Sequence, residues 1–207
     1  GGFATSNTAT ASTTYDANSS TVLMTVDTTS GAKVVHETKR VFAYQPGKSL
    51  LIYNTFVMEE EKEGLRQRVG YFGANNGVFL EQSGNTVSFV IRSMSTGAIA
   101  EDAVTQENWN VDKLDGAGPS LKSLDITKAQ IFFTDIEWLG VGAVRCGFVI
   151  DGQLIHCHTF HHANLTDNTY MTTACLPIRY EIENIAETAT SSTMRRICSS
   201  VPDSNCL

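Results

Sequence analysis

The stretch RVGYFGANNGVFLEQSGNTVSFVIRS, residues 68–93, decides the fold class of this chain. It contains three runs rich in Val, Phe, Tyr and Ile, and these runs are separated by two short turn sequences, Asn76-Gly77 and Gly84-Asn85. Pairs of Asn and Gly between apolar runs are typical of tight hairpin turns, and strands joined by such turns lie antiparallel. The stretch therefore predicts a three-stranded antiparallel meander.

Hairpin patterns continue on both sides of this meander. Residues 40–58 place two apolar runs around Pro46-Gly47, a pair that suits a type II turn. No amphipathic helix longer than two turns is apparent; the acidic segment 57–65 is too short to form a helix alone. Further strand-like runs cover residues 124–140, 144–162 and 170–184. The sequence therefore predicts an all-β fold, an antiparallel β-sandwich of jelly-roll type.

The composition divides the chain into three parts. Residues 1–30 consist mostly of Ser, Thr and Ala, which supply little apolar surface, so we expect an N-terminal arm or linker there. Within it, residues 21–28 have the composition of an edge strand, or of one that pairs with a neighbouring subunit. We expect the β-sandwich over residues 31–186 and a polar C-terminal tail over residues 187–207.

Charge and hydropathy exclude two classes of partner. The formal net charge is −7 and the basic residues do not cluster, whereas a nucleic-acid binder needs a basic face. No apolar run approaches the roughly 20 residues that span a bilayer. We therefore expect neither nucleic acid nor membrane as a partner, and no motif calls for a cofactor.

The segment VRCGFVIDGQLIHCHTFHH, residues 144–162, gathers two cysteines and four histidines. A hairpin turn at Asp151-Gly152 would place Cys146 opposite Cys157 and Arg145 opposite His158. Side chains alternate along a strand, so both cysteines would face the core while His156 and His158 would face outward beside Arg145. We expect reduced core thiols, with a disulfide between the two cysteines as the alternative.

Four histidines of this segment are candidate metal ligands: His156, His158, His161 and His162. The predicted hairpin separates them from the cysteines, and the Arg145 guanidinium beside them disfavours a divalent cation. We therefore expect hydrogen-bonded imidazoles and no metal site. Arg145 together with His158 is a candidate contact for an anionic group.

Asp135 and Glu137 would lie on one face of a strand, where two carboxylates can approach the separation used in glycoside hydrolysis. Solvated acids on a strand are the more common reason for this pattern. No nucleophile elbow and no recognisable catalytic triad accompany them. We therefore assign no catalytic residues and expect that the chain is not an enzyme.

Aromatic side chains at loop tips would allow the chain to stack on sugar rings. Trp109, Trp138, Tyr71 and Tyr170 are the candidates, and the apolar strand around Trp138 predicts that this tryptophan is buried. Trp109, in a polar stretch, is expected near the surface. The candidate ligand-binding residues are therefore Trp109, Arg145, His158 and Tyr170.

Residues of about 39–184, including RVFAYQPGKSLLIYNTFVM, IFFTDIEWLGVGAVRCGFVIDGQLIHCHTF and YMTTACLPIRYEIEN, resemble a recurrent domain of virion structural proteins in tailed marine phages, cyanophages among them. The resemblance implies a location in the virion and a structural, non-enzymatic subunit of a tail fibre, baseplate, neck appendage or capsid-surface decoration. Its implied partners are other copies of the chain, as a trimer in a fibre, and other virion proteins. The alternative function is a lectin-like module that binds a host surface glycan.

Overall fold

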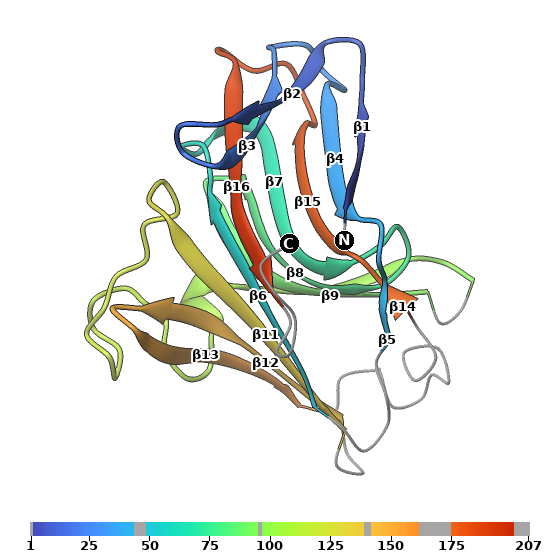
Figure 1. The fold of residues 1–207 in the computed structure, drawn as a ribbon. Helices are drawn as coiled ribbons and strands as arrows, with labels where there is room; N and C mark the ends of the chain where they lie inside the picture. Colours follow the sequence, from blue (N-terminus) through green and yellow to red (C-terminus); the bar gives the residue numbers. More distant parts are fainter. Residues whose placement is uncertain (1, 44–48, 95–96, 139–141, 162–174, 201–207) are drawn as a thin grey trace.

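The computed structural model describes residues 2–43, 49–94, 97–138, 142–161 and 175–200, which form two seven-stranded antiparallel sheets packed face to face (Figure 1). Sheet A contains, from edge to edge, β1 (Phe3–Asn7), β4 (Lys33–Thr38), β15 (Ile178–Asn184), β7 (Lys62–Phe72), β8 (Gly77–Gly84), β9 (Thr86–Ser93) and β10 (Ala100–Thr105). Sheet B contains β13 (Gln153–His161), β12 (Gly142–Ile150), β11 (Gln130–Trp138), β6 (Leu50–Val57), β16 (Ser192–Ser200), β3 (Thr21–Val26) and β2 (Ala11–Asp16). The fold is the predicted jelly-roll-like β-sandwich.

The predicted meander is confirmed as β7, β8 and β9. Tyr71 pairs with Val78 and Phe72 with Gly77 across the first turn, where the N–H of Gly73 donates to the carbonyl oxygen of Asn76 at 2.8 Å. Gly77 has φ 132°, a value that suits a residue without Cβ. The local turn residues therefore determine this part of sheet A.

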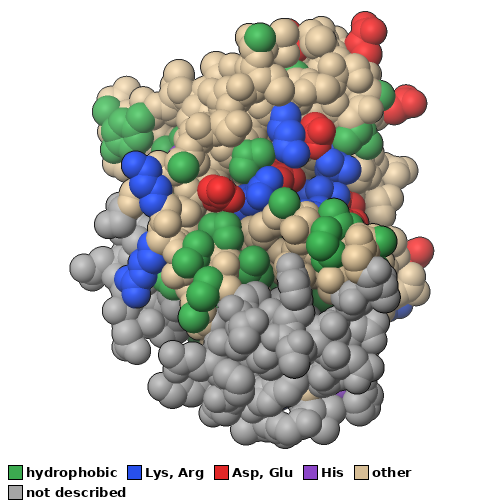
Figure 2. All heavy atoms as spheres, turned by 90° about the vertical axis from the view of Figure 1, so that its right-hand side faces the viewer, with side chains coloured by type: hydrophobic (Ala, Val, Ile, Leu, Met, Phe, Trp, Pro, Cys, Tyr) green, Lys and Arg blue, Asp and Glu red, His purple; other side chains and the backbone are tan. Residues whose placement is uncertain are grey.

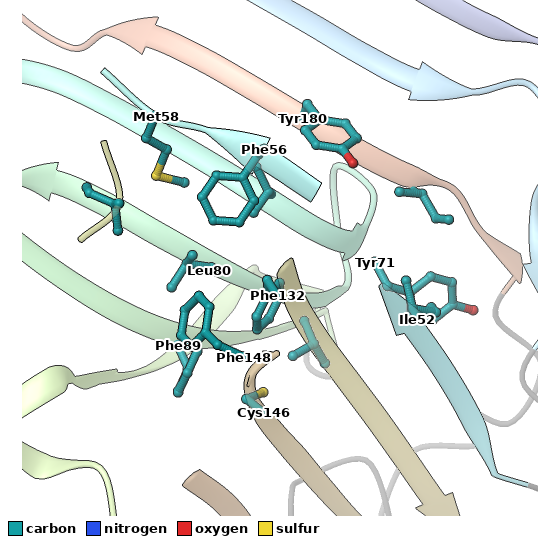
Figure 3. Close-up of a cluster of buried hydrophobic side chains, with 14 of the residues drawn as sticks. Ile52, Phe56, Met58, Tyr71, Leu80, Phe89, Phe132, Cys146, Phe148 and Tyr180 are labelled. Atoms are coloured by element: carbon teal, nitrogen blue, oxygen red, sulfur yellow. The ribbon is translucent and has the colours of Figure 1, made fainter. Parts of the chain in front are cut away.

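Aromatic side chains join the two sheets in the core. Phe89 of sheet A lies 5.7 Å from Phe132 and 6.0 Å from Phe148 of sheet B, measured between ring centroids. All three are fully buried, and Figure 3 shows them beside Phe56 and Leu80. Full burial of such a side chain contributes about 1.5–3 kcal/mol, so this cluster is a main source of the attraction between the sheets.

The N-terminal segment differs from the expected arm. Residues 3–26 form three strands: β1 extends sheet A, whereas β2 and β3 belong to sheet B. Val22, Met24 and Val26 point into the core and are buried. Alternation of these three residues with Leu23 and Thr25 supplies the apolar face that the average composition of residues 1–30 hides.

The C-terminal segment also differs from the expected tail. Strand β16 lies inside sheet B, between β6 and β3 (Figure 1). Met194 is fully buried, and Thr25 and Thr193 are hydrogen-bonded through their hydroxyl oxygens at 2.9 Å. The first and last parts of the described chain therefore complete one sheet together.

The strands on either side of Pro46-Gly47, which the sequence predicted to pair as a hairpin, do not pair with each other. Strand β5 (Phe42–Ala43) pairs with β14 (Cys175–Leu176) in a small separate sheet, whereas β6 belongs to sheet B. The hydroxyl of Tyr71 donates to the carbonyl oxygen of Phe42 at 2.5 Å, which ties the small sheet to sheet A. The turn itself, residues 44–48, lies outside the described residues.

The hairpin of β12 and β13 has the predicted turn but a shifted register. Ile150 pairs with Gln153 and Phe148 with Ile155, as predicted. A β-bulge then places Cys146 opposite His158, so that Cys157 has no partner residue on β12. Both cysteines are buried and free, in agreement with the prediction of reduced core thiols.

Candidate functional site

Several loops meet at one end of the sandwich and enclose an open cleft of about 570 Å³. They are the β6–β7 connection, the β8–β9 turn, the short 3-10 helix η1 (Gln106–Asn108) and the segment before β11. The lining residues are Glu60, Glu61, Asn85, Thr86, Val87, Thr105, Gln106, Glu107, Leu124, Asp125, Ile126 and Thr127. Strands from both sheets therefore position this opening.

A buried amide holds the β6–β7 connection in place. Oε1 of Gln67 accepts from the N–H of Glu59 at 2.7 Å, and Nε2 of Gln67 donates to the carbonyl oxygen of Glu59 at 3.0 Å. Met58, the preceding residue, is buried and donates its N–H to the carbonyl oxygen of Ile126. These bonds leave Glu60 and Glu61 exposed at the mouth of the cleft.

The opposite wall is a turn around Asp125. Oδ1 of Asp125 accepts from the hydroxyl of Thr127 at 2.6 Å and from its N–H at 3.0 Å. These two hydrogen bonds lower the pKa of the Asp125 carboxyl. Gln130 donates from Nε2 to the carbonyl oxygen of Asp125 at 2.7 Å. The wall therefore presents an ionised carboxylate on a fixed turn.

The lining of the cleft combines an aliphatic floor with polar walls. Val87, Leu124 and Ile126 are half-buried or buried and supply the apolar part. The polar part consists of carboxylates, amides and hydroxyls, and the lining contains no Lys or Arg. A few polar groups around an apolar surface are typical of small-molecule sites.

Two neighbouring openings continue the cleft. One, of about 440 Å³, shares Glu61 and Asn85 with it, and the other, of about 670 Å³, shares Glu60 and Asp125 and extends to Arg195. We call the residues that line these three openings the polar furrow. Its extent suits a chain of several linked units better than one small molecule.

The outer side of sheet A carries a second polar surface, the ionic face, on the concave side of the bent strands (Figure 1). Viewed from the right-hand side of Figure 1, acidic and basic side chains gather in the middle of the molecule (Figure 2). Five basic and five acidic residues form it: Lys33, Arg66, Arg68, Arg92 and Arg179 with Glu37, Glu81, Glu101, Glu181 and Glu183.

The groups at the centre of the ionic face already bind one another. Nε of Arg68 lies 2.6 Å from Glu81, and Nη2 of Arg179 lies 2.6 Å from Glu181. Burial alone would raise the pKa of Glu181, but Arg179, Lys33 and Arg68 outweigh this effect and lower it. Only 8% of the Arg68 side chain and 3% of that of Glu181 are exposed. The centre of the ionic face is therefore structural, whereas the polar furrow is open.

The structure does not join the three described candidate histidines, His156, His158 and His161, into a site. His158 was expected to face outward beside Arg145 but is buried, because the bulge shifts the register; its Nδ1 accepts from the N–H of Asn110 at 3.1 Å. Nε2 of half-buried His156 lies 2.7 Å from the hydroxyl of Thr159. Burial lowers the pKa of both rings. His161 is exposed at the end of β13.

Within the described ranges, no group of three or more His, Cys, Asp or Glu residues could hold a metal ion. His162 lies outside those ranges. Cys146 and Cys157 are poor metal ligands here because burial raises the pKa of both thiols. The described part of the chain also contains no helix long and apolar enough to cross a membrane.

Arg145 pairs with acids rather than with His158. It lies opposite Thr159 on β13, and its Nη1 lies 3.1 Å from Glu137 and 3.9 Å from Asp135 on β11. Burial, and secondly the Glu137 charge, raise the pKa of Asp135. Arg145 is thus the counterion of the two acids that the sequence placed on one face, and it is not available as an anion site.

Two of the four aromatic candidates, Trp109 and Tyr71, are not available for sugar stacking. Trp109, expected near the surface, is buried; its ring stacks on Phe89 at 4.1 Å and its Nε1 donates to the carbonyl oxygen of Val104. Tyr71 is fully buried. Tyr170 lies outside the described residues, and Trp138 is described only as part of β11.

Sequence reasoning missed the polar furrow. The signal in the sequence was the run of acids in residues 57–65. From its composition alone, this run suggests a short helix rather than the wall of a cleft. The structure instead places these acids in a connection between β6 and β7, next to loops more than 20 residues away in sequence.

The sequence matches no family model and no curated protein. Similar solved structures include a GH16 protein of the Bacteroides ovatus mixed linkage glucan PUL (TM-score 0.59, 12% identity, 96% of this chain and 94% of that chain). They also include the carbohydrate recognition domain of Emp47p (0.57, 9%, 96% and 87%) and the botulinum neurotoxin serotype C1 binding domain (0.56, 12%, 96% and 43%). At such identities the similarity shows the fold alone, and this fold is shared by glycoside hydrolases and lectins.

Proposed function

We propose that this chain is a carbohydrate-binding module that binds an uncharged glycan in the polar furrow. One observation carries the proposal: an open cleft combines an aliphatic floor with walls of carboxylate, amide and hydroxyl groups. A sugar ring has the matching chemistry, because its C–H faces are apolar and its hydroxyls both donate and accept hydrogen bonds. Proteins with this fold that bind or cut glycans support the proposal by analogy.

The charge of the 570 Å³ cleft within the furrow selects the kind of glycan. Glu60, Glu61, Glu107 and Asp125 line the 570 Å³ cleft, and no basic residue is among its lining residues. Uronate, sialate or sulfate groups would meet like charges there, whereas the carboxylates accept hydrogen bonds from uncharged hydroxyls. A neutral oligosaccharide is therefore the ligand class that fits.

Binding suits the furrow better than hydrolysis. A glycosidase needs a carboxylic acid that keeps its proton near the working pH, and such an acid has a raised pKa. Asp125 has a lowered pKa because Thr127 donates two hydrogen bonds to it. Asp135, which has a raised pKa, does not line the furrow and is paired with Arg145. We therefore propose a module without catalytic activity.

Isothermal titration calorimetry with neutral glucan, mannan and galactan oligosaccharides, and with oligogalacturonate of equal length, tests the proposal. We expect binding of at least one neutral oligosaccharide and none of oligogalacturonate. Asn85→Ala/Glu107→Ala in the furrow should weaken binding at least about tenfold, or about 1.4 kcal/mol. Asn18→Ala/Glu187→Ala, two exposed positions elsewhere, is the matched control. Preference for the anionic oligosaccharide, absence of binding across the panel, or equal loss in the control would contradict the proposal.

We also propose that the module acts at the surface of a phage particle, where glycan binding would serve host recognition. This proposal rests on the resemblance of residues 39–184 to domains of virion structural proteins. Mass spectrometry of purified particles should detect the chain, and antibodies against it should label them. Detection in infected cells but not in purified particles would contradict this location.

A further inference from the structure

The two sheets leave four edge strands, and these differ in how they are protected. An edge strand with unpaired backbone groups invites pairing with another chain unless charges, bulges or a covering segment prevent it. We propose that β2 (Ala11–Asp16) pairs edge to edge with β2 of a second copy of this chain, antiparallel about a two-fold axis beside Thr13. The resulting dimer would join the two copies of sheet B into one continuous sheet.

The backbone of β2 has free hydrogen-bonding groups on its outer side. The carbonyl oxygen of Thr10 accepts from Asp27 on the β3 side, at 3.2 Å. Because backbone groups alternate in direction along an antiparallel strand, the N–H and C=O groups of Thr13 and Tyr15 and the C=O group of Ala11 point away from β3, whereas the Ala11 N–H donates to the carbonyl oxygen of Thr8 at 3.1 Å. Strand β2 is the last strand of sheet B, so these groups point outward from the sandwich.

The opposite edge of sheet B is covered. The N–H groups of Val111 and Asp112 both donate to the carbonyl oxygen of Cys157 in β13. The Asn110 side chain donates to the carbonyl oxygen of Thr159 and accepts from its N–H, each at 2.9 Å. A segment of this chain thus occupies the β13 edge where the bulge lies, and that edge is closed to a partner.

The two edges of sheet A are also less suited to self-pairing. Strand β10 carries Glu101 and Asp102, and an antiparallel β10 pair would bring the acids of both copies close together. Strand β1 is uncharged, but the ring of its one aromatic residue, Phe3, already stacks on His36 at 4.5 Å. Of these four edges, β2 is the one with a large exposed ring, that of Tyr15, and its one acid, Asp16, lies at the end of the strand.

Strand β2 is self-complementary in the proposed register. With Thr13 facing its own copy, Ser12 faces Thr14 and Ala11 faces Tyr15 of the partner, so no like charges oppose each other. The Tyr15 side chain is 67% exposed in the single chain. Pairing would cover this ring against the partner's Ala11, which accounts for an aromatic residue on an edge of Ser, Thr and Ala.

Light scattering of the full chain in solution tests the proposal. One chain has a mass of 22.5 kDa, so we expect a particle of about 45 kDa, twice that mass. Ser12→Lys/Thr14→Lys places a lysine of one copy opposite a lysine of the other at both Ser12–Thr14 contacts. The like charges should repel, and the variant should be a monomer. Ser12→Glu/Thr14→Lys places opposite charges there instead and should restore the dimer. Ala100→Lys/Ala103→Lys, which adds the same charge to β10, should leave the dimer intact.

Any result that differs from these four expectations overturns the inference. A monomeric or trimeric wild-type chain contradicts it, because pairing of one edge with itself closes at two copies. A dimer that survives lysines at positions 12 and 14 uses another surface. Failure of the Glu/Lys variant to dimerise contradicts the two-fold register. Positions 12 and 14 are exposed and their side chains face solvent, so we expect these variants to fold. Circular dichroism of every variant checks that each has done so.

Discussion

The side-chain amide of Gln67 forms two hydrogen bonds with the backbone of Glu59, one to its N–H and one to its carbonyl oxygen. Gln67 is fully buried, and its Nε2 also donates to Gln82 at 2.8 Å. A polar core residue of sheet A thereby sets the position of the acids that line the polar furrow.

Replacement of this amide should destabilise the fold and disturb the furrow together. Gln67→Met keeps the volume but leaves the part-buried backbone groups of Glu59 without the Gln67 amide, so we expect a loss of about 2–3 kcal/mol in the free energy of unfolding. Urea denaturation measures this loss, and calorimetry should show weaker glycan binding. Asn108→Ala, which removes an exposed hydrogen bond to Thr105, should cost less than about 0.5 kcal/mol. Equal costs for the two variants would refute the structural role of Gln67.

The ionic face predicts a large difference between buried and exposed ion pairs. Arg68 lies 2.6 Å from Glu81 and 3.6 Å from Glu181, and its guanidinium lies 5.0 Å from the Phe79 ring centroid. Arg68→Met removes the cation beside Glu81 in a largely buried place, while Glu181 keeps Arg179 and Lys33, so we expect a loss of about 3–5 kcal/mol.

The control for this prediction is the Lys122–Asp151 pair, in which 72% of the Asp151 side chain is exposed. Lys122→Met should change the free energy of unfolding by less than about 1 kcal/mol. Both variants are measured by urea denaturation at low and at high salt. If Arg68→Met were as mild as Lys122→Met, the ionic face would not be a stabilising network.

Local signals in the sequence predicted the parts of the fold that depend on neighbours in the chain. The meander of residues 68–93 and the turn at Asp151-Gly152 follow from turn residues that favour one geometry, and the inward cysteines follow from alternation along a strand. The turn residues carry no signal for the bulge at Cys157, which lies where Asn110 and Asp112 bind β13 from a loop distant in sequence.

Pairings between distant segments were the main failure of sequence reasoning. Strands β3 and β16 are about 170 residues apart and complete one sheet, yet each lies in a segment whose composition predicts an arm or a tail. The same limit hid the polar furrow, because its walls come from four separate loops. Each loop alone reads as an ordinary solvated connection, and only the fold brings the carboxylates, amides and aliphatic floor together.

The two acids of β11 provide a test of the non-catalytic proposal. Asp135→Asn/Glu137→Gln removes the carboxylate charges beside Arg145, whose side chain is 43% exposed, so the free energy of unfolding should change by less than about 1 kcal/mol. Glycan affinity should be unchanged, because neither residue lines the furrow. Release of reducing ends from polysaccharides should be absent before and after the change. Hydrolysis by the wild-type chain that disappears in this variant would show that the chain is an enzyme.

His36 should make the stability of the fold depend on pH. Its ring is buried between Phe3 and Tyr180, its Nδ1 lies 2.8 Å from the hydroxyl of Thr5, and Arg196 is the charged group near it. Burial, and secondly the Arg196 charge, lower the pKa of His36 from 6.5 to about 4. Between these values the unfolded chain binds a proton that the folded chain does not, so the free energy of unfolding falls as the pH falls from about 6.5 to about 4.

The contribution of His36 can be separated from those of the other groups by comparison with His36→Gln, which keeps a polar group near Thr5 but cannot be protonated. Glu181, with its lowered pKa, and the histidines of β13 add losses of the same sign at low pH in both proteins. Urea denaturation at pH 7.5 and pH 4 should therefore show a larger loss in the wild-type chain, by up to about 3 kcal/mol. Equal losses in the two proteins would mean that His36 accepts its proton as readily in the fold as in the unfolded chain.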